Sequence, residues 1–153
     1  HIISGIMWIG HLWYFNFTQT PTMQKIPNKL RPAVVRFILP EALFWFRWGA
    51  MFTLGFGLIL SYMNGYLLDA IKIGIGDNNH KFTAIGIGMW LGTNMWINVW
   101  FIIMPNPNKV MGVTSATPDE INAARRIAGQ ASRINTMLSI PMLYGMVFAA
   151  HFY

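Results

Sequence analysis

Four long apolar runs separated by shorter polar connections dominate this chain. The runs cover residues 1–18, 41–66, 83–104 and 134–153. A helix that crosses the hydrocarbon core of a bilayer needs about 20 apolar residues, so the outer two runs are just long enough and the middle two are comfortable. No run alternates with the period of two that indicates strands of a membrane barrel. The pattern therefore predicts an all-α fold: a single domain over 1–153 that forms an integral membrane four-helix bundle. We expect the first helix to begin upstream of residue 1.

The connections carry the signals that stop and start helices. Four prolines in the first connection predict that it is not helical: Pro21, Pro27, Pro32 and Pro40. The third connection contains Thr117 as an N-cap, Pro118 at the first helical position, and then two acids. An apolar stripe follows at Ile121, Ala124, Ala128 and Ala131. These signals predict an amphipathic surface helix over about 118–132, ahead of the fourth span.

Composition and charge agree with a membrane location. Hydrophobic residues make up 54% of the 153 residues and charged residues 10%, and the net charge is +6. A basic chain can bind nucleic acid, but here the basic residues flank apolar spans, where they mark the cytoplasmic side of a membrane. We therefore expect the lipid bilayer and other membrane subunits as partners, and no nucleic acid. The basic residues of the first and third connections are Lys25, Lys29, Arg31, Arg36, Lys109, Arg125 and Arg126. These two connections should face the cytoplasm, and both termini and the 67–82 connection should face outward.

The absence of cysteine leaves histidine as the main candidate for holding a cofactor. Without cysteine the chain has no disulfide, no thiolate metal site and no covalently attached haem. With alternating helix directions, His1, His80 and His151 fall at the outer membrane face. His11 lies roughly 15 Å deeper than His1, at ~1.5 Å of rise per residue.

A layer of polar residues is expected at the depth of His11. Its other members are Arg47, Asn94, Asn98 and Ser139. An arginine or a histidine inside a membrane is costly, so it usually faces the bundle interior and pairs with other polar groups. No nucleophile triad, phosphate loop or paired carboxylate accompanies this layer, and we assign no catalytic residue.

Three interpretations of these residues remain open. The first is a b-type haem for electron transfer, with His1 and His151 as the candidate ligand pair. The second is copper or another metal held by His1, His80 and His151, which has no tight histidine spacing in its favour. His80 follows polar loop residues, which favours a solvated position for it. The third is an accessory subunit without a cofactor, in which the polar layer only joins helices. We favour a membrane subunit of a larger respiratory-type complex, with or without haem.

Several strings resemble one known family. They are WIGHLWYFNFTQTP, FWFRWGAMFTLGFGLIL, NVWFIIMPNPNKVMG and ARRIAGQASRINTMLSIPMLYGMVFAAHFY. Together they resemble the urate oxidase N-terminal family, the membrane domain of bacterial membrane-bound urate hydroxylases. The resemblance implies a multi-pass protein of the bacterial cytoplasmic membrane.

The resemblance also implies a chemistry. In longer family members a cytochrome c domain follows the membrane portion, which implies electron transfer out of the membrane. This chain has no Cys-x-x-Cys-His motif and is shorter, so it looks like a short, stand-alone relative. If urate or a similar purine were the substrate, Arg47 would be the anion clamp and His11 the acid or base.

Overall fold

The computed structural model describes residues 1–76, 79–110 and 115–152, and every regular element among them is helical. The N-terminal hairpin consists of two long helical arms. The first arm is α1 (Ile2–Trp13), η1 (Tyr14–Gln19) and α2 (Thr20–Met23), and the second is α3 (Arg31–Ala33), η2 (Val34–Ile38) and α4 (Leu39–Met63). The segments named η are π-helical turns, which are wider than α-helical ones.

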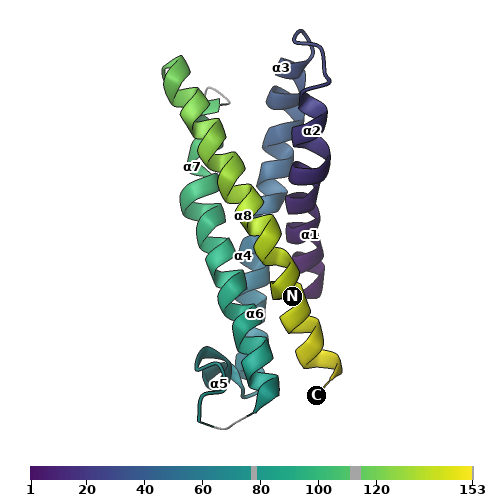
Figure 1. The fold of residues 1–153 in the computed structure, drawn as a ribbon, viewed down its shortest axis with the longest axis vertical. Coiled ribbons are helices and arrows are strands. Elements are labelled where there is room, and N and C mark those ends of the chain that lie inside the picture. Colours follow the sequence, from purple (N-terminus) through teal and green to yellow (C-terminus); the bar gives the residue numbers. More distant parts are fainter. Residues whose placement is uncertain (77–78, 111–114, 153) are drawn as a thin grey trace.

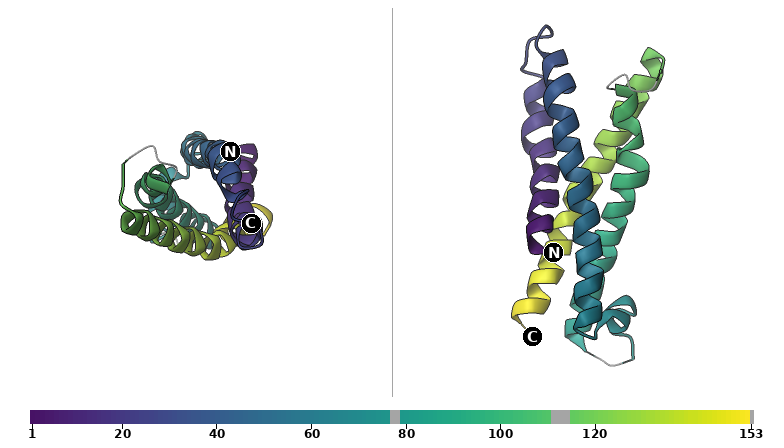
Figure 2. Two further views of the ribbon diagram at one scale, coloured as in Figure 1. Left: turned by 90° about the horizontal axis from the view of Figure 1, so that it is seen from above. Right: turned by 180° about the vertical axis from the view of Figure 1, so that it is seen from behind.

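The C-terminal hairpin follows a short helix, α5 (Leu67–Ile71). Its first arm is α6 (His80–Ile97), η3 (Asn98–Ile103) and α7 (Pro105–Val110), and its second is α8 (Pro118–His151). The hairpins lie side by side and diverge toward the end that carries the α2–α3 turn (Figures 1 and 2). Both termini lie toward the other end, as does α5 (Figure 1). This arrangement matches the expected alternation of helix directions.

Pro21 and Pro40 lie inside helices that they were predicted to interrupt, and Pro105 is the first residue of α7. Each of these three prolines follows shortly after a π-helical turn. The residues before Pro21, Pro40 and Pro105 donate their N–H groups to carbonyls five residues back, on Phe15, Val34 and Val99. A proline ring in an α-helix clashes with the carbonyl four residues back, and a wider turn relieves that clash. The prediction that Pro21 and Pro40 break helices is therefore wrong, and Pro32 likewise lies within α3. Only Pro27 of the four lies in the non-helical turn between the arms.

The third connection ends as predicted, but the helix after it is longer. Thr117 and Glu120 form a reciprocal capping box, with the Thr117 N–H donating to Glu120 Oε2 over 2.8 Å. The expected surface helix 118–132 and the fourth apolar run are one continuous helix, α8, which also contains Pro141. Its small residues Ala124 and Ala131 are buried. Residue 153, the end of the expected fourth run, lies outside the described residues.

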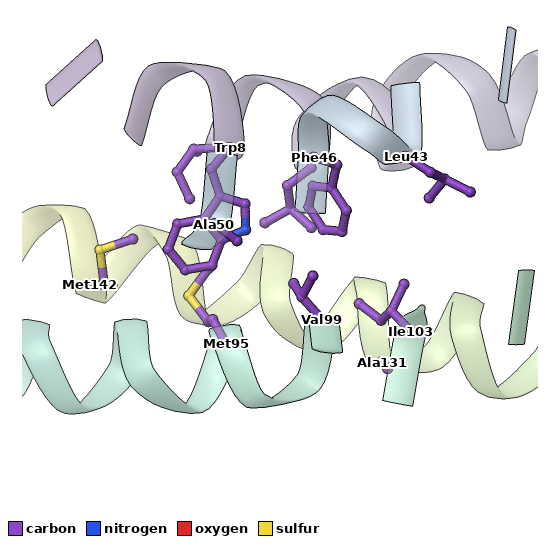
Figure 3. Packing of buried hydrophobic residues seen from close by; sticks show 11 residues of the cluster. Trp8, Leu43, Phe46, Ala50, Met95, Val99, Ile103, Ala131 and Met142 are labelled. Atoms are coloured by element: carbon purple, nitrogen blue, oxygen red, sulfur yellow. The ribbon is translucent and has the colours of Figure 1, made fainter. Parts of the chain in front are cut away.

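The core lies between the hairpins and is made by large side chains from one and smaller ones from the other. Trp8 and Phe46 are 2% and 1% exposed. They face Met95, Val99 and Met142 across the interface (Figure 3). Within the N-terminal hairpin, Gly49 lets α4 approach α1 closely, because a Cβ there would lie 3.1 Å from the Trp8 backbone nitrogen. The outer surface is also apolar, with many exposed Ile, Leu, Phe and Met side chains along α1, α4 and α8.

Within the described residues, two of the helical arms are long and apolar enough to cross a membrane, over residues 31–63 and 80–107. A soluble core helix is usually mostly buried, whereas these two are 28% and 22% buried over their most apolar windows. Much of the apolar surface of these two arms is therefore exposed.

Candidate functional site

His1 is seated against α4. Its Nδ1 atom lies 2.9 Å from the Thr53 carbonyl oxygen. The ring occupies space that a side chain at position 57 would need, because a Cβ on Gly57 would lie 2.9 Å from His1 Cε1. His1 also lines an open groove of about 460 Å³ between α1 and α4, together with apolar residues such as Phe56 and Met63. This exposed imidazole is thus held against α4 by one hydrogen bond.

The other two histidines expected at this end are placed differently. His151 bonds to its own helix, with Nδ1 3.0 Å from the Val147 carbonyl oxygen, and does not line the His1 groove. His80 is the first residue of α6 and is exposed. Among the described residues, no group of three or more His, Asp or Glu side chains is placed to hold a metal ion. The structure therefore does not assemble the copper site suggested for His1, His80 and His151.

The hydrogen bonds of three histidines define their tautomer. In His1, His11 and His151 the Nδ1 atom lies 2.8–3.0 Å from a main-chain carbonyl, so Nδ1 carries the proton that is donated. Nε2 is then the free lone pair in each neutral ring, which is the usual form of an imidazole that binds a metal or accepts a proton. Each of these three histidines could thus give a metal one ligand, but they lie at separate positions.

His11 lies in a second groove and not in the expected polar layer. Its Nδ1 donates to the Met7 carbonyl over 2.8 Å. The groove measures about 840 Å³, lies between the two arms of the N-terminal hairpin, and contains Tyr14, Glu41 and Trp45 besides His11. Asn94 is exposed and donates to the Trp90 carbonyl of its own helix. The structure thus separates His11 and Asn94 from Asn98 and Ser139.

Ser139 belongs to a polar seam along α8, which we define as Ser132, Asn135 and Ser139, and Asn98 of η3 bonds to this seam. Asn98 Nδ2 donates to Asn135 Oδ1 over 2.9 Å, and Asn135 Nδ2 donates to the Met95 carbonyl over 3.0 Å. Asn135 and Ser139 are fully buried. These bonds join the two arms of the C-terminal hairpin.

The same seam joins the two hairpins to each other. Trp13 Nε1 donates to Ser139 Oγ over 3.0 Å, and Asn16 Nδ2 donates to Ser132 Oγ over 2.7 Å. Sequence reasoning missed Trp13, Asn16 and Ser132. The seam residues follow one another at spacings of three and four, which places them on one helix face and could have revealed the seam.

Arg47 is held by aromatic rings. Its guanidinium carbon lies 4.8 Å from the centre of the Trp100 ring and 5.4 Å from that of Trp48. Its Nε atom is buried and has no hydrogen-bond partner in the described part of the chain. Cation–π contacts of this kind are worth about 2 kcal/mol when they are desolvated. They stabilise the half-buried guanidinium, which forms no ion pair with a carboxylate among the described residues.

The aromatic cluster around Arg47 also contains unpaired donors. Trp96 and Trp100 lie 6.2 Å apart between ring centres, and the Nε1 atoms of both are buried without a partner within the described residues. Trp8 Nε1 is in the same condition in the core. The side chains of this cluster, Arg47, Trp48, Trp96 and Trp100, offer hydrogen-bond donors and one positive charge, and none of the four side chains carries an acceptor.

Comparisons with known proteins identify the family from the C-terminal half of the chain. No curated protein and no solved structure matches this sequence. The family model described as urate oxidase N-terminal matches residues 77–153, which include α6, η3, α8 and the polar seam. The two N-terminal strings that resemble the family lie outside the matched range. On the strength of this match over half of its length, the chain belongs to the urate oxidase N-terminal family.

Proposed function

We propose that the chain is an integral membrane subunit of a larger respiratory-type complex, with four helices crossing the bilayer. One observation carries the proposal: large apolar side chains are exposed along the helices, while polar side chains of α8 are buried among the apolar core residues. The Asn135 and Ser139 side chains are fully buried. In contrast, Ile3 of α1 is 83% exposed, and Ile140 and Tyr144 of α8 are 64% and 67% exposed. In water the exposed side chains would be unfavourable, and in lipid they are the expected surface.

The proposed orientation follows from the basic residues at one end. The α2–α3 turn and the start of α8 lie at the same end of the molecule, opposite to the termini, on the two diverging hairpins (Figure 1). Lys25, Lys29 and Arg31 flank that turn, and Arg125 and Arg126 follow the start of α8. By the positive-inside rule this end is cytoplasmic, and the termini and α5 are on the outer side of the bacterial inner membrane.

Labelling of single cysteines tests the topology without background, because the natural chain has no cysteine. Asn28→Cys in the α2–α3 turn and Asn64→Cys after α4 are compared in intact cells with a maleimide that cannot cross the membrane. The expected result is labelling at position 64, and labelling at position 28 only after the cells are opened. Release of the natural chain from membranes by alkaline carbonate would contradict the proposal.

A b-type haem with an electron-transfer role is the second candidate, and the observation in its favour is the His1 ring, which is hydrogen-bonded to α4 through Nδ1 and leaves the Nε2 lone pair for a metal. The expected pairing with His151 has no support in the contacts, because the two rings bond to different helices and share no groove. We propose His1 as one ligand, with the opposite ligand contributed from outside this chain. A dithionite-reduced absorption spectrum of the membrane complex tests this: the α-band should disappear in His1→Ala and persist in His151→Ala.

A subunit without a cofactor and an enzyme acting on urate are the remaining candidates. For the first, the polar seam and the Arg47 cluster serve only to hold helices together, and the haem band should then be absent from the natural complex. For the second, family membership is the main support, and the donor-rich Arg47 cluster suits a planar anion. Urate turnover by the purified chain, lost in Arg47→Gln, would favour it.

A further inference from the structure

The groove beside His11 has the size and composition of a ligand site. Its volume of about 840 Å³ falls within the range of about 300–1,000 Å³ that is typical of small-molecule sites. Most of its lining is apolar and includes Ile3, Ile6, Phe37 and Trp45. Such sites usually combine an apolar lining with a few polar groups that orient the ligand.

The polar side chains that line the groove are His11, Glu41 and Tyr14, and the first two offer hydrogen-bond acceptors. Because His11 Nδ1 donates to the Met7 carbonyl, its Nε2 carries a lone pair and no proton in the neutral ring. The Glu41 carboxylate also lines the groove, and it makes no hydrogen bond or ion pair with any described residue. A ligand that satisfies both groups must therefore bring two hydrogen-bond donors.

The rest of the lining favours a flat ring with an apolar tail. Tyr14 and Trp45 offer aromatic surfaces near His11 and Glu41, and Ile3 and Ile6 extend the apolar lining toward the start of α1. Under the proposed function, on which this step rests, the open side of the groove faces lipid. The ligand would then enter from the bilayer.

We propose that this groove binds a membrane-soluble dihydroxy aromatic compound of the quinol class. One hydroxyl donates to His11 Nε2 and the other to Glu41, while the ring packs against Trp45 and the tail follows Ile6 and Ile3. A phospholipid chain would use only the apolar lining and leave both acceptors unpaired. A helix from a partner subunit would cover the groove permanently, so that the quinol could not enter it in native membranes.

The test uses the full chain in phosphatidylcholine nanodiscs and a photoreactive quinol whose adducts are located by peptide mass spectrometry. We expect adducts on peptides that contain Ile6, Phe37 or Trp45. Unlabelled decylubiquinol should compete at least about tenfold better than its dimethyl ether, which cannot donate, since a hydrogen bond to a charged or buried group is worth about that factor. Equal competition by the two compounds would show nonspecific occupation of an apolar groove and would overturn the proposal.

Variants separate the groove from the rest of the lipid-facing surface. Glu41→Gln and His11→Phe should each weaken decylubiquinol competition about tenfold, and Ala42→Trp should fill the groove and abolish specific labelling. Met137→Trp is the matched control, because Met137 is 66% exposed on α8 and does not line the groove. Circular dichroism shows whether each variant is folded. If a variant with a bulkier side chain fails to fold, the isosteric Glu41→Gln variant decides the outcome.

Two further outcomes would overturn the proposal while leaving the proposed function intact. Labelling in nanodiscs that is absent in native membranes would indicate a partner helix in the groove. Absence of labelling in a chain that resists carbonate extraction would show a membrane subunit without this site. If alkaline carbonate extracts the chain from membranes, the chain is not an integral membrane subunit. The proposed function then fails, and the groove does not face lipid.

Discussion

The side-chain amide of Asn98 donates to Asn135 Oδ1 over 2.9 Å, and Asn135 in turn donates to the Met95 carbonyl. This pair links η3 to α8 at a point where Asn135 has no exposed surface. Because a buried amide without partners is costly, the bond constrains the register between the two arms of the C-terminal hairpin.

Replacing Asn135 with alanine should destabilise the protein by about 1–2 kcal/mol, since it leaves Asn98 and the Met95 carbonyl without their partner. The matched control is Asn94→Ala. Asn94 is exposed and bonds only within its own helix, so its removal should change stability by less than about 0.5 kcal/mol. Reversible unfolding in mixed micelles measures both. Equal effects of the two substitutions would contradict the role of the polar seam.

Two glycines of α8 should respond in opposite directions to alanine. A Cβ on Gly145 would lie 2.9 Å from the Ala84 carbonyl oxygen on α6, so Gly145→Ala should cost about 1–3 kcal/mol through overpacking. A Cβ on Gly129 would meet nothing within 4 Å, so Gly129→Ala should stabilise by up to about 1 kcal/mol through helix propensity. Thermal unfolding of the two variants checks this prediction. Stabilisation by Gly145→Ala would show that α6 and α8 do not approach as described.

Arg47 and Trp100 should be energetically coupled. Trp100→Leu removes the ring that lies 4.8 Å from the guanidinium carbon. The substitution should cost about 0.5–2 kcal/mol more in the natural chain than in an Arg47→Met background, where no cation needs the ring. A double-mutant cycle on unfolding free energies measures the difference. A coupling energy of zero would mean that the rings contribute only packing.

The capping box of α8 should stabilise its first turn only locally. Thr117→Ala removes the acceptor of the Glu120 N–H group and should cost about 1 kcal/mol. Amide hydrogen exchange should accelerate in residues 119–121 and remain unchanged near Asn135. Ser115→Ala, just outside the helix, serves as the control. Faster exchange along the whole of α8 would indicate that the helix depends on its cap to a greater extent than its packing suggests.

The sequence by itself determined the helical class, the apolar segments, the cap at Thr117 and the alternation of helix directions, because these depend on composition and on neighbours along the chain. It did not reveal that Pro21 and Pro40 continue their helices, since that depends on how a π-helical turn widens the backbone before each ring. Only the tertiary structure decided which polar residues meet. Asn94 and Asn98 are four apart, yet the packing of α8 joins Asn98 to Asn135 through a partly buried bond and leaves the bond of Asn94 exposed. His11 and Arg47 likewise lie apart, in a groove and in a tryptophan cluster, because side-chain partners depend on helix rotation and crossing, which local sequence does not specify.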